Sequence, residues 1–354
     1  MSSKQFFSDI VGNRDLRERL GYDLMSDTLP HAITLEGPRG SGKHTIARMC
    51  AASLACEKKL DISKPLPCLE CASCRKVMEG KSPDVITLGT DGKSTIGIDT
   101  VRFLREDVFI VPNDKEHKVY IIEDADKMTV QAQNALLLTL EEPPKYVHFF
   151  LLCENSGSLL ETIRSRSPIL RTEPIPTEDI DAYIVKHDRR AAQMKLSDPR
   201  AYAELLVSAK FGIGLALEYL EPKVFAPIRQ TRALAAEFTK AAVCGGGAKA
   251  ILPLIPQGQS KSSSVQFSSK RDILRDQLSA LEDAVRDLIL LKKSDNAPLS
   301  FYFDRNEAIE LCDRASMQFL YTLREAINTA LNENARNANV RLMLIKMALT
   351  ADLI

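Results

Sequence analysis

The chain has 354 residues, of which 45% are hydrophobic, and its 47 basic and 47 acidic side chains give a formal net charge of zero. This length suits two or three domains, each with its own core. A balanced charge excludes a protein drawn to nucleic acid or membrane by a global electrostatic field, so any DNA contact must be local. Residues 1–13 lack a signal-peptide pattern, and the apolar runs are too short to span a bilayer, so we expect a cytoplasmic protein.

The first predicted elements form a strand, a loop and a helix. A buried strand is predicted at 31–37 (HAITLEG) and a helix at 44–56 (HTIARMCAASLAC), and the connecting residues 37–44 read GPRGSGKH. Seven of these eight loop positions fit a phosphate-binding P-loop, and the strand, loop and helix order is the frame that such a loop requires. We therefore predict a P-loop fold, with a glycine-rich surface turn as the alternative.

The loop residues predict a nucleotide site with one defect. The residues suited to phosphate are Gly37, Gly40, Gly42 and Lys43. Glycine tolerates the positive φ that turns backbone N–H groups toward phosphate oxygens, and the lysine would reach the outer phosphates. The last position should carry a hydroxyl for Mg²⁺ but is His44, and imidazole is a poor ligand for this cation. Thr45 lies one residue too late, so binding of ATP and Mg²⁺ stays an open question.

A cysteine-rich segment follows the helix. Four of the eight cysteines lie close together in the sequence, at Cys56, Cys68, Cys71 and Cys74. The last three are spaced to wrap one tetrahedral ion while the first arrives from the preceding helix, so we predict structural zinc. An iron–sulfur cluster is the main alternative, although the C-x3-C-P pattern that usually accompanies it is absent. Four unrelated buried thiols, or Cys50 in place of the first ligand, are further alternatives, and Cys153 and Cys312 are predicted core residues.

Further apolar runs predict the rest of a sheet. Strands are expected at 84–88 (DVITL), 118–124 (KVYIIED) and 147–153 (VHFFLLC), separated by helical stretches. This alternation predicts an α/β domain with a largely parallel sheet.

Two carboxylates, Glu123 and Asp124, end the predicted strand at 118–124. A P-loop protein uses this position to hold Mg²⁺ and to orient water, which makes the pair a candidate metal contact. The order is inverted from the usual Asp-Glu, which moves each carboxylate by one methylene. A solvated loop start is the alternative.

Two arginines, Arg164 and Arg166, follow the predicted strand at 147–153. A lone arginine here is typically a solvated surface residue. In oligomeric P-loop ATPases an arginine can instead reach the γ-phosphate bound to a neighbouring subunit. The residues alone leave both interpretations open.

Beyond about residue 172 the sequence predicts only helices. Short helices are expected to about residue 222, and segments such as 279–293 carry apolar side chains at helical spacing. Gly-rich residues 244–249 and the Ser-rich stretch 257–272 interrupt them, and the latter is predicted to be a mobile loop.

Together these segments resemble the subunits of bacterial DNA polymerase III clamp loaders. The resemblance is carried by FFSDIVGN (6–13), the loop, the cysteines, KVYIIEDADKM (118–128) and, above all, QAQNALLLTLEEPPKYVHFFLLCENSGSLLETIRSRS (131–167). The stretch NALLLTLEEPP is very specific. LEDAVRDLILL and NENARNANVRLMLIKMAL are similar to the helical collar of these subunits, though these motifs are weaker.

The resemblance implies a three-part chain. An α/β AAA+ P-loop domain is expected at 1–172 with a zinc module inserted at about 56–80, followed by a small helical lid at 173–225 and an all-α collar at 226–354. The implied partners are gamma/tau and delta subunits in a five-membered ring, with the sliding clamp and primed DNA reached through the complex and no membrane involved.

Three departures from the family pattern favour the delta-prime type of subunit over the ATP-hydrolysing type. His44 replaces the hydroxyl residue, the carboxylate pair is inverted, and the segment 210–220 carries Leu215 or Leu217 where a lid arginine is expected. An active AAA+ ATPase is the alternative, and a zinc-dependent scaffold with a relic P-loop is a third.

The serine-arginine-cysteine motif of the family is represented by Ser165, Arg166 and Ser167. The resemblance therefore implies that Arg166 completes the ATP site of a neighbouring subunit. On this interpretation the chain contributes to catalysis on its neighbour while hydrolysing little or no ATP itself.

Overall fold

A computed structural model describes residues 4–90, 92–114, 116–210, 212–244, 270–336 and 338–352. The chain divides into two compact units, the first comprising Met1–Tyr183 with Phe211–Leu215, and the second Ile184–Lys210 with Ala216–Ile354. Each unit has its own buried hydrophobic cluster or clusters. The expected three-part division into domain, lid and collar stays a prediction.

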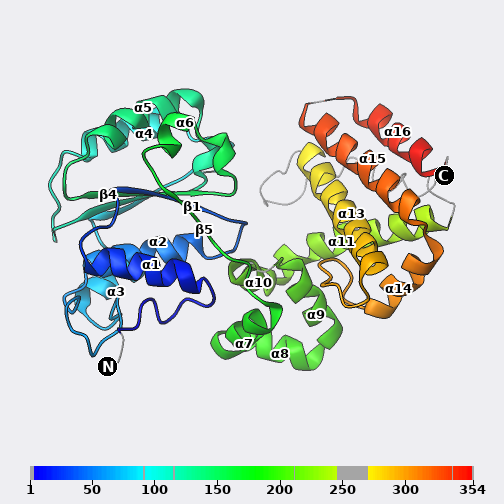
Figure 1. Ribbon diagram of the computed structural model, residues 1–354, viewed down its shortest axis with the longest axis horizontal. Helices are drawn as coiled ribbons and strands as arrows, with labels where there is room; N and C mark the ends of the chain where they lie inside the picture. The colour runs from blue at the N-terminus through cyan, green and yellow to red at the C-terminus, as the bar shows by residue number, and fades with distance from the viewer. Residues whose placement is uncertain are drawn as a thin grey trace. The chain divides into compact units, whose positions relative to one another are not determined.

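A five-stranded parallel sheet in the order β2-β3-β4-β1-β5 lies at the centre of the first unit (Figure 1). The strands are β1 (Ala32–Glu36), β2 (Val85–Leu88), β3 (Lys118–Ile122), β4 (Val147–Cys153) and β5 (Ile169–Arg171). Each pairing is parallel, and Thr34 of β1 is in register with Leu151 of β4 on one side and Ile169 of β5 on the other. The predicted α/β domain with a parallel sheet is confirmed.

Helices cover both faces of this sheet (Figure 1). One face carries α1 (Arg14–Met25), α2 (Lys43–Leu54) and α3 (Ala72–Met78), and the other carries α4 (Ile98–Asp107), α5 (Val130–Glu141) and α6 (Glu161–Arg164). Strand side chains alternate between the faces, so Phe150 packs in the first layer and Phe149 in the second. Because both faces are buried, the strands appear in the sequence as continuous apolar runs.

The second unit is helical. Its helices include α8 (Arg189–Ser197), α9 (Pro199–Ser208), α11 (Pro222–Val243), α13 (Lys270–Lys293), α14 (Arg305–Arg314), α15 (Met317–Ala335) and α16 (Val340–Asp352), while α7 (Thr177–His187) and α10 (Ile213–Tyr219) cross the division between the units. Its core joins α11 and α13 to α14, α15 and α16 (Figure 1). The predicted helical C-terminal region is thus present.

The Gly-rich residues 244–249 and the predicted mobile loop at 257–272 lie almost entirely outside the described residues. A membrane-spanning helix is absent from the part of the chain that the structure describes.

A histidine pair in the first unit joins β4 to the residue before β3. His148 of β4 is 8% exposed, and its Nε2 lies 3.2 Å from Nδ1 of His117. Burial lowers the pKa of His148 to about 4, with the charge of His117 as the second cause. Burial also lowers the pKa of His117, and the nearby carboxylate of Asp27 only partly opposes both shifts. The folded unit therefore favours neutral imidazoles here.

The chain is expected to lose stability as the pH falls from 6.5 toward about 4. His148 in the unfolded chain binds a proton near pH 6.5, whereas in the folded unit it does so only near pH 4. The unfolded state therefore binds more protons in this window, and the free energy of unfolding falls by about 3 kcal/mol at most. Urea denaturation at several pH values measures this slope, and His148→Gln should flatten it. An unchanged slope in that variant would contradict the assignment.

Candidate nucleotide site and four-cysteine cluster

The glycine-rich loop leaves the carboxyl end of β1 and enters α2. Gly40 and Gly42 have φ of +78° and +87°, the left-handed region that favours glycine. Gly37 is required for a different reason, because a Cβ atom there would lie 1.8 Å from Oγ1 of Thr172. That hydroxyl donates to Oγ of Ser41 at 2.9 Å. Each predicted glycine of the loop thus has a structural requirement of its own.

Lys43 is the first residue of α2, and its ammonium group folds back onto the loop. Nζ donates to the carbonyl oxygens of Gly37 at 2.6 Å and Pro38 at 2.9 Å. Burial lowers the pKa of Lys43, and the carboxylate of Glu154 is the largest opposing influence. The N-cap residue Gly42 offers no side-chain acceptor to the first turn of α2. A cation beside free N–H groups at a helix N-terminus is suited to a phosphate group.

The structure brings together two of the predicted nucleotide-site residues, His44 and Glu123. Nε2 of His44 lies 3.3 Å from Oε1 of Glu123, and both side chains are partly exposed. Burial lowers the pKa of His44, while Glu123 opposes the shift and Arg48 adds to it. At neutral pH the contact is therefore a polar one between a neutral ring and the carboxylate. His44 occupies the position where the P-loop pattern has a hydroxyl residue for Mg²⁺. Its ring contacts Glu123, one of the two predicted carboxylates.

Asp124 and Thr45 are placed differently. Asp124 has a φ of +50°, and its carboxylate pairs with Nζ of Lys127 at 2.9 Å. Thr45 is exposed on α2. The structure therefore does not gather all the predicted nucleotide residues around one metal position.

Sequence reasoning missed two acidic residues near the loop. Asp126 and Glu154 both act on the pKa of Lys43, and Oδ2 of Asp126 accepts a hydrogen bond of 3.3 Å from the backbone N–H of Glu154. They follow β3 and β4, which are neighbours in the sheet, and β4 in turn pairs with β1. The sequence could have indicated both residues, because each follows a predicted strand and the carboxyl ends of parallel strands meet at one edge of a sheet.

The segment that precedes and starts α10 packs directly on the loop. The backbone N–H of Gly214 donates to the carbonyl oxygen of Gly40 at 3.1 Å. A Cβ atom at Gly212 would lie 3.0 to 3.1 Å from backbone atoms of Arg39 and Gly40. Leu215 also contacts Gly40 and is 9% exposed. This segment therefore covers the loop with backbone and an apolar side chain.

Arg166 lies on the surface of the first unit, just after α6. Its Nη2 pairs with Oε1 of Glu141 at 2.9 Å, and Nη1 donates to the carbonyl oxygen of Thr162 at 3.0 Å. Both members of the ion pair are more than a third exposed, so the pair contributes little stability and is easily exchanged. Ser167, in contrast, is fully buried, with Oγ 2.9 Å from Oγ1 of Thr34. Only Arg166 of these two is available to another molecule.

The four predicted metal ligands form one buried cluster. The sulfur atoms of Cys56, Cys68, Cys71 and Cys74 all lie within 4.8 Å of one another. Four thiolates at about 2.3 Å from a tetrahedral zinc ion would be separated by about 3.8 Å, so a small contraction of the cluster suffices. Cys50 is buried elsewhere and is not part of it. The donor set and the spacing fit a structural metal ion.

Backbone donors and burial act on these thiols in opposite directions. Burial raises the pKa of Cys56 and of Cys74. Burial would also raise the pKa of Cys68, but hydrogen bonds from the backbone N–H groups of Cys71 and Glu70, and from the side chains of Cys56 and Cys71, together lower that pKa to about 7. The N–H of Cys71 lies 3.4 Å from Sγ of Cys68. Complete ionisation of the cluster requires a cation at its centre.

Comparison with known proteins relates the first unit to a replication family. Residues 12–176 match a family described as "DNA polymerase III, delta subunit". The chain is 37% identical over 164 residues to DNA polymerase III subunit tau of Bacillus subtilis, covering 46% of this chain and 28% of that protein. It is 33% identical over 180 residues to subunit gamma of Buchnera aphidicola, covering 51% and 48%.

One solved structure that resembles the chain is the DNA polymerase III gamma subunit-related protein of Thermotoga maritima. The TM-score is 0.42 and the sequence identity is 18%, and the match covers 95% of this chain and 98% of that one. The chain spans less than half the length of the two curated relatives. Its first unit is similar to DNA polymerase III subunits. The matched family and relatives bear the names delta, tau and gamma, so the comparisons do not identify one type of subunit.

Alanine substitutions at Gly40 and Gly42 should separate the packing of the loop from its conformation. Gly42→Ala meets no atom within 4 Å, so it should cost about 1 to 2 kcal/mol for the left-handed backbone alone. Gly40→Ala also places a Cβ atom 2.8 Å from the backbone nitrogen of Leu215, which should add about 1 to 3 kcal/mol. Urea denaturation of both variants measures the difference, and equal losses would show that the loop and this segment separate freely.

Proposed function

We propose that this chain is a delta-prime-like subunit of the sliding-clamp loader of DNA polymerase III. In this role it supports ATP-driven loading of the clamp onto primed DNA and hydrolyses little or no ATP itself. The observation that carries the proposal is the contact between His44 and Glu123, 3.3 Å apart at the position where a P-loop ATPase would bind Mg²⁺.

The residues of the site fit a phosphate group but not its metal ion. The loop glycines and Lys43 have the conformation and charge that phosphate oxygens need. Mg²⁺ demands oxygen ligands in near-octahedral geometry, and the imidazole of His44 supplies none. Leu215, which covers the loop, is one of the two positions where the family resemblance leads us to expect an arginine in a motor subunit. We therefore assign no hydrolytic step to this chain.

Arg166 supports a contribution to catalysis on a neighbouring subunit. Its guanidinium is on the surface and is held by the exposed carboxylate of Glu141. Exchange of that carboxylate for the γ-phosphate of a neighbour's ATP would neutralise charge that develops during phosphoryl transfer. Arg166 would then be a catalytic residue of the neighbouring site.

The proposed partners are gamma/tau and delta subunits, which would form a five-membered ring with this chain. The helices α13, α15 and α16 of the second unit are the proposed collar through which the ring assembles. The sliding clamp and primed DNA would be reached through the complex, and the assembly would work in the cytoplasm.

A second candidate function, an active AAA+ ATPase of the gamma/tau type, is favoured by two observations. The relatives bear the names tau and gamma, and the glycines and lysine of the P-loop are intact. On this alternative, water or Thr45 would have to take the place of the missing hydroxyl.

For the four-cysteine cluster we propose structural zinc. The sulfur atoms are buried and closely spaced, and Cys₄ is a common closed zinc site. An ion there would join the end of α2 to the start of α3, because Cys56 follows the one helix and Cys74 belongs to the other. Such a site stabilises the fold without taking part in the chemistry of the nucleotide.

Hydrolysis assays distinguish the two candidate functions. The purified chain should show negligible Mg²⁺-dependent ATP hydrolysis, and Lys43→Ala should leave that value unchanged. In the reconstituted loader, Arg166→Ala should lower clamp-dependent hydrolysis by about 10³-fold or more. Arg164→Ala is the matched control, because Arg164 is exposed two residues away. Turnover by the isolated chain that disappears in Lys43→Ala would instead identify an ATPase.

Elemental analysis tests the metal assignment. The purified chain should contain one zinc ion, and the double variant Cys71→Ser, Cys74→Ser should lose both the metal and stability. Cys244→Ser is the control, because Cys244 is exposed and lies outside the cluster. Stoichiometric iron with visible colour would exclude zinc in favour of an iron–sulfur cluster.

A further inference from the structure

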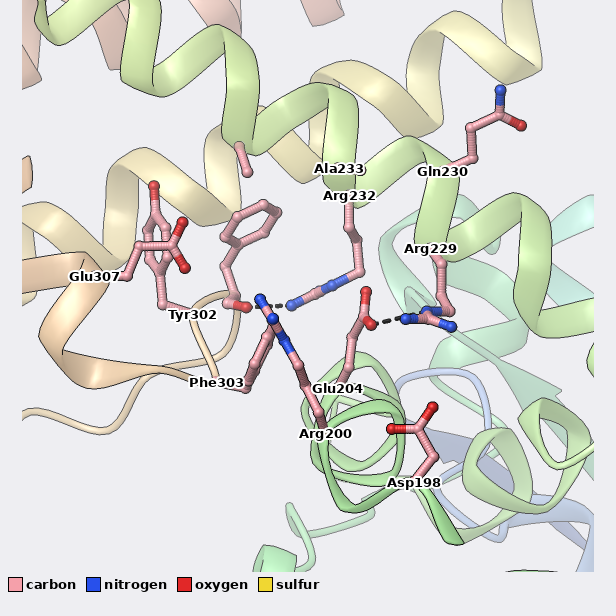
Figure 2. A pocket seen from close by; sticks show the side chains of 12 residues that line it. Asp198, Arg200, Glu204, Arg229, Gln230, Arg232, Ala233, Tyr302, Phe303 and Glu307 are labelled. Carbon is pink, nitrogen blue, oxygen red and sulfur yellow. Dashed lines mark hydrogen bonds and ion pairs between the residues drawn. The ribbon is translucent and has the colours of Figure 1, made fainter. Parts of the chain in front are cut away.

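The second unit contains a pocket of about 540 Å³ that neither the P-loop nor the cysteine cluster touches. It lies between α9, α11 and the residues that lead into α14 (Figure 2). Its wall includes Arg200, Arg229 and Arg232 together with the aromatic residues Phe301 and Phe303. The volume falls in the range of pockets that hold small organic ligands.

Arg232 of α11 is a buried cation with few partners. It is 8% exposed, and Nη2 donates to the carbonyl oxygen of Phe301. The guanidinium also lies 4.5 Å from the centre of the Phe301 ring. A guanidinium has five N–H donors, and no carboxylate of the described residues lies within ion-pair distance of this one. Burial lowers the pKa of Arg232, and Glu204 and other nearby carboxylates oppose this only in part.

Arg200 supplies a second cation without a carboxylate partner. Its guanidinium lies 5.4 Å from the centre of the Phe303 ring, and it forms no ion pair with the described residues. Figure 2 shows Arg200 extending from α9 toward the guanidinium of Arg232. In contrast, Arg229 is matched by Glu204 at 2.8 Å. The pocket therefore presents two guanidinium groups that its own acids do not neutralise.

Asp198, an acidic residue of the pocket wall, caps a helix and does not pair with an arginine of the pocket. It precedes α9 as the N-cap residue, and its Oδ1 accepts from the backbone N–H of Ala201 at 3.0 Å. Glu307 is exposed at the start of α14. Neither carboxylate lies within ion-pair distance of Arg200 or Arg232 in the described structure.

Hydrogen bonds to a buried carboxylate hold the aromatic wall of the pocket in place. Asp287 of α13 is fully buried, and its Oδ2 accepts from the backbone N–H groups of Ser300 at 2.9 Å, Phe301 at 2.6 Å and Tyr302 at 3.2 Å. These bonds fix the chain that carries the Phe301 carbonyl and rings. The pocket is thus formed before any ligand arrives, which lowers the entropic cost of binding.

We propose that this pocket binds an organic oxyanion of about mononucleotide size, with its phosphate or carboxylate group between Arg200 and Arg232 and its apolar body against Phe303. Guanidinium groups match the geometry of an oxyanion with paired N–H donors. An anion there would supply the countercharge that buried Arg232 lacks. The pocket exceeds the size of a bare ion, so the anion should carry an organic group.

Calorimetry on the full chain in a Lys43→Ala background tests this site without binding at the P-loop. The probes are AMP, N-benzoyl-aspartate and inorganic phosphate. AMP or N-benzoyl-aspartate should bind about tenfold or more tightly than phosphate, and Arg200→Gln should weaken that binding by about tenfold or more. Binding of AMP alone would identify a phosphate ligand, and binding of N-benzoyl-aspartate alone would identify a carboxylate ligand.

Lys223→Gln is the matched control, because it removes one exposed positive charge from α11 outside the pocket lining. Its affinity should stay within about threefold of the background protein. Because Arg200 is exposed, Arg200→Gln should unfold at the same urea concentration as the background, so lost binding cannot be ascribed to lost fold. The proposal is overturned if neither organic probe saturates the protein by about 10 mM, or if Arg200→Gln binds them unchanged.

Discussion

The parallel pairing of β1 between β4 and β5 is the constraint on which the first unit depends. It brings the carboxyl ends of neighbouring strands to one edge of the sheet, and the residues that follow them must then share that edge. The glycine-rich loop follows β1, Glu123 follows β3, and Glu154 follows β4. Thr172, after β5, closes the space beside Gly37. A one-strand change of order would disperse this arrangement.

Within that arrangement, the residue after Lys43 is the one that departs from the P-loop pattern. The imidazole of His44 stands there in place of a hydroxyl, and its Nε2 lies 3.3 Å from Oε1 of Glu123. The P-loop backbone keeps its conformation because that depends on glycines and on packing against Thr172 and Gly214. The residues that fix the backbone of the loop are therefore different from the residue that departs from the pattern.

Two buried charged side chains of the second unit differ in the hydrogen-bond partners that surround them. The carboxylate of Asp287 receives three backbone N–H groups, which replace the water it lost on folding. Arg232 receives one carbonyl oxygen and an aromatic ring, and no carboxylate among the described residues pairs with it. The first arrangement is structurally complete, while the second leaves donor capacity beside a cavity. That asymmetry makes the pocket, and not Asp287, the candidate for ligand binding.

The sequence by itself predicted the parallel sheet, the P-loop glycines and the cysteine cluster, because these depend on local patterns: continuous apolar runs, positive φ, and close spacing of Cys68, Cys71 and Cys74. Only the tertiary structure showed that His44 meets Glu123, that Gly214 packs on Gly40, and that Arg200 and Arg232 share a cavity. These contacts join residues from different elements, and their distances depend on how helices and strands pack, which no local pattern specifies.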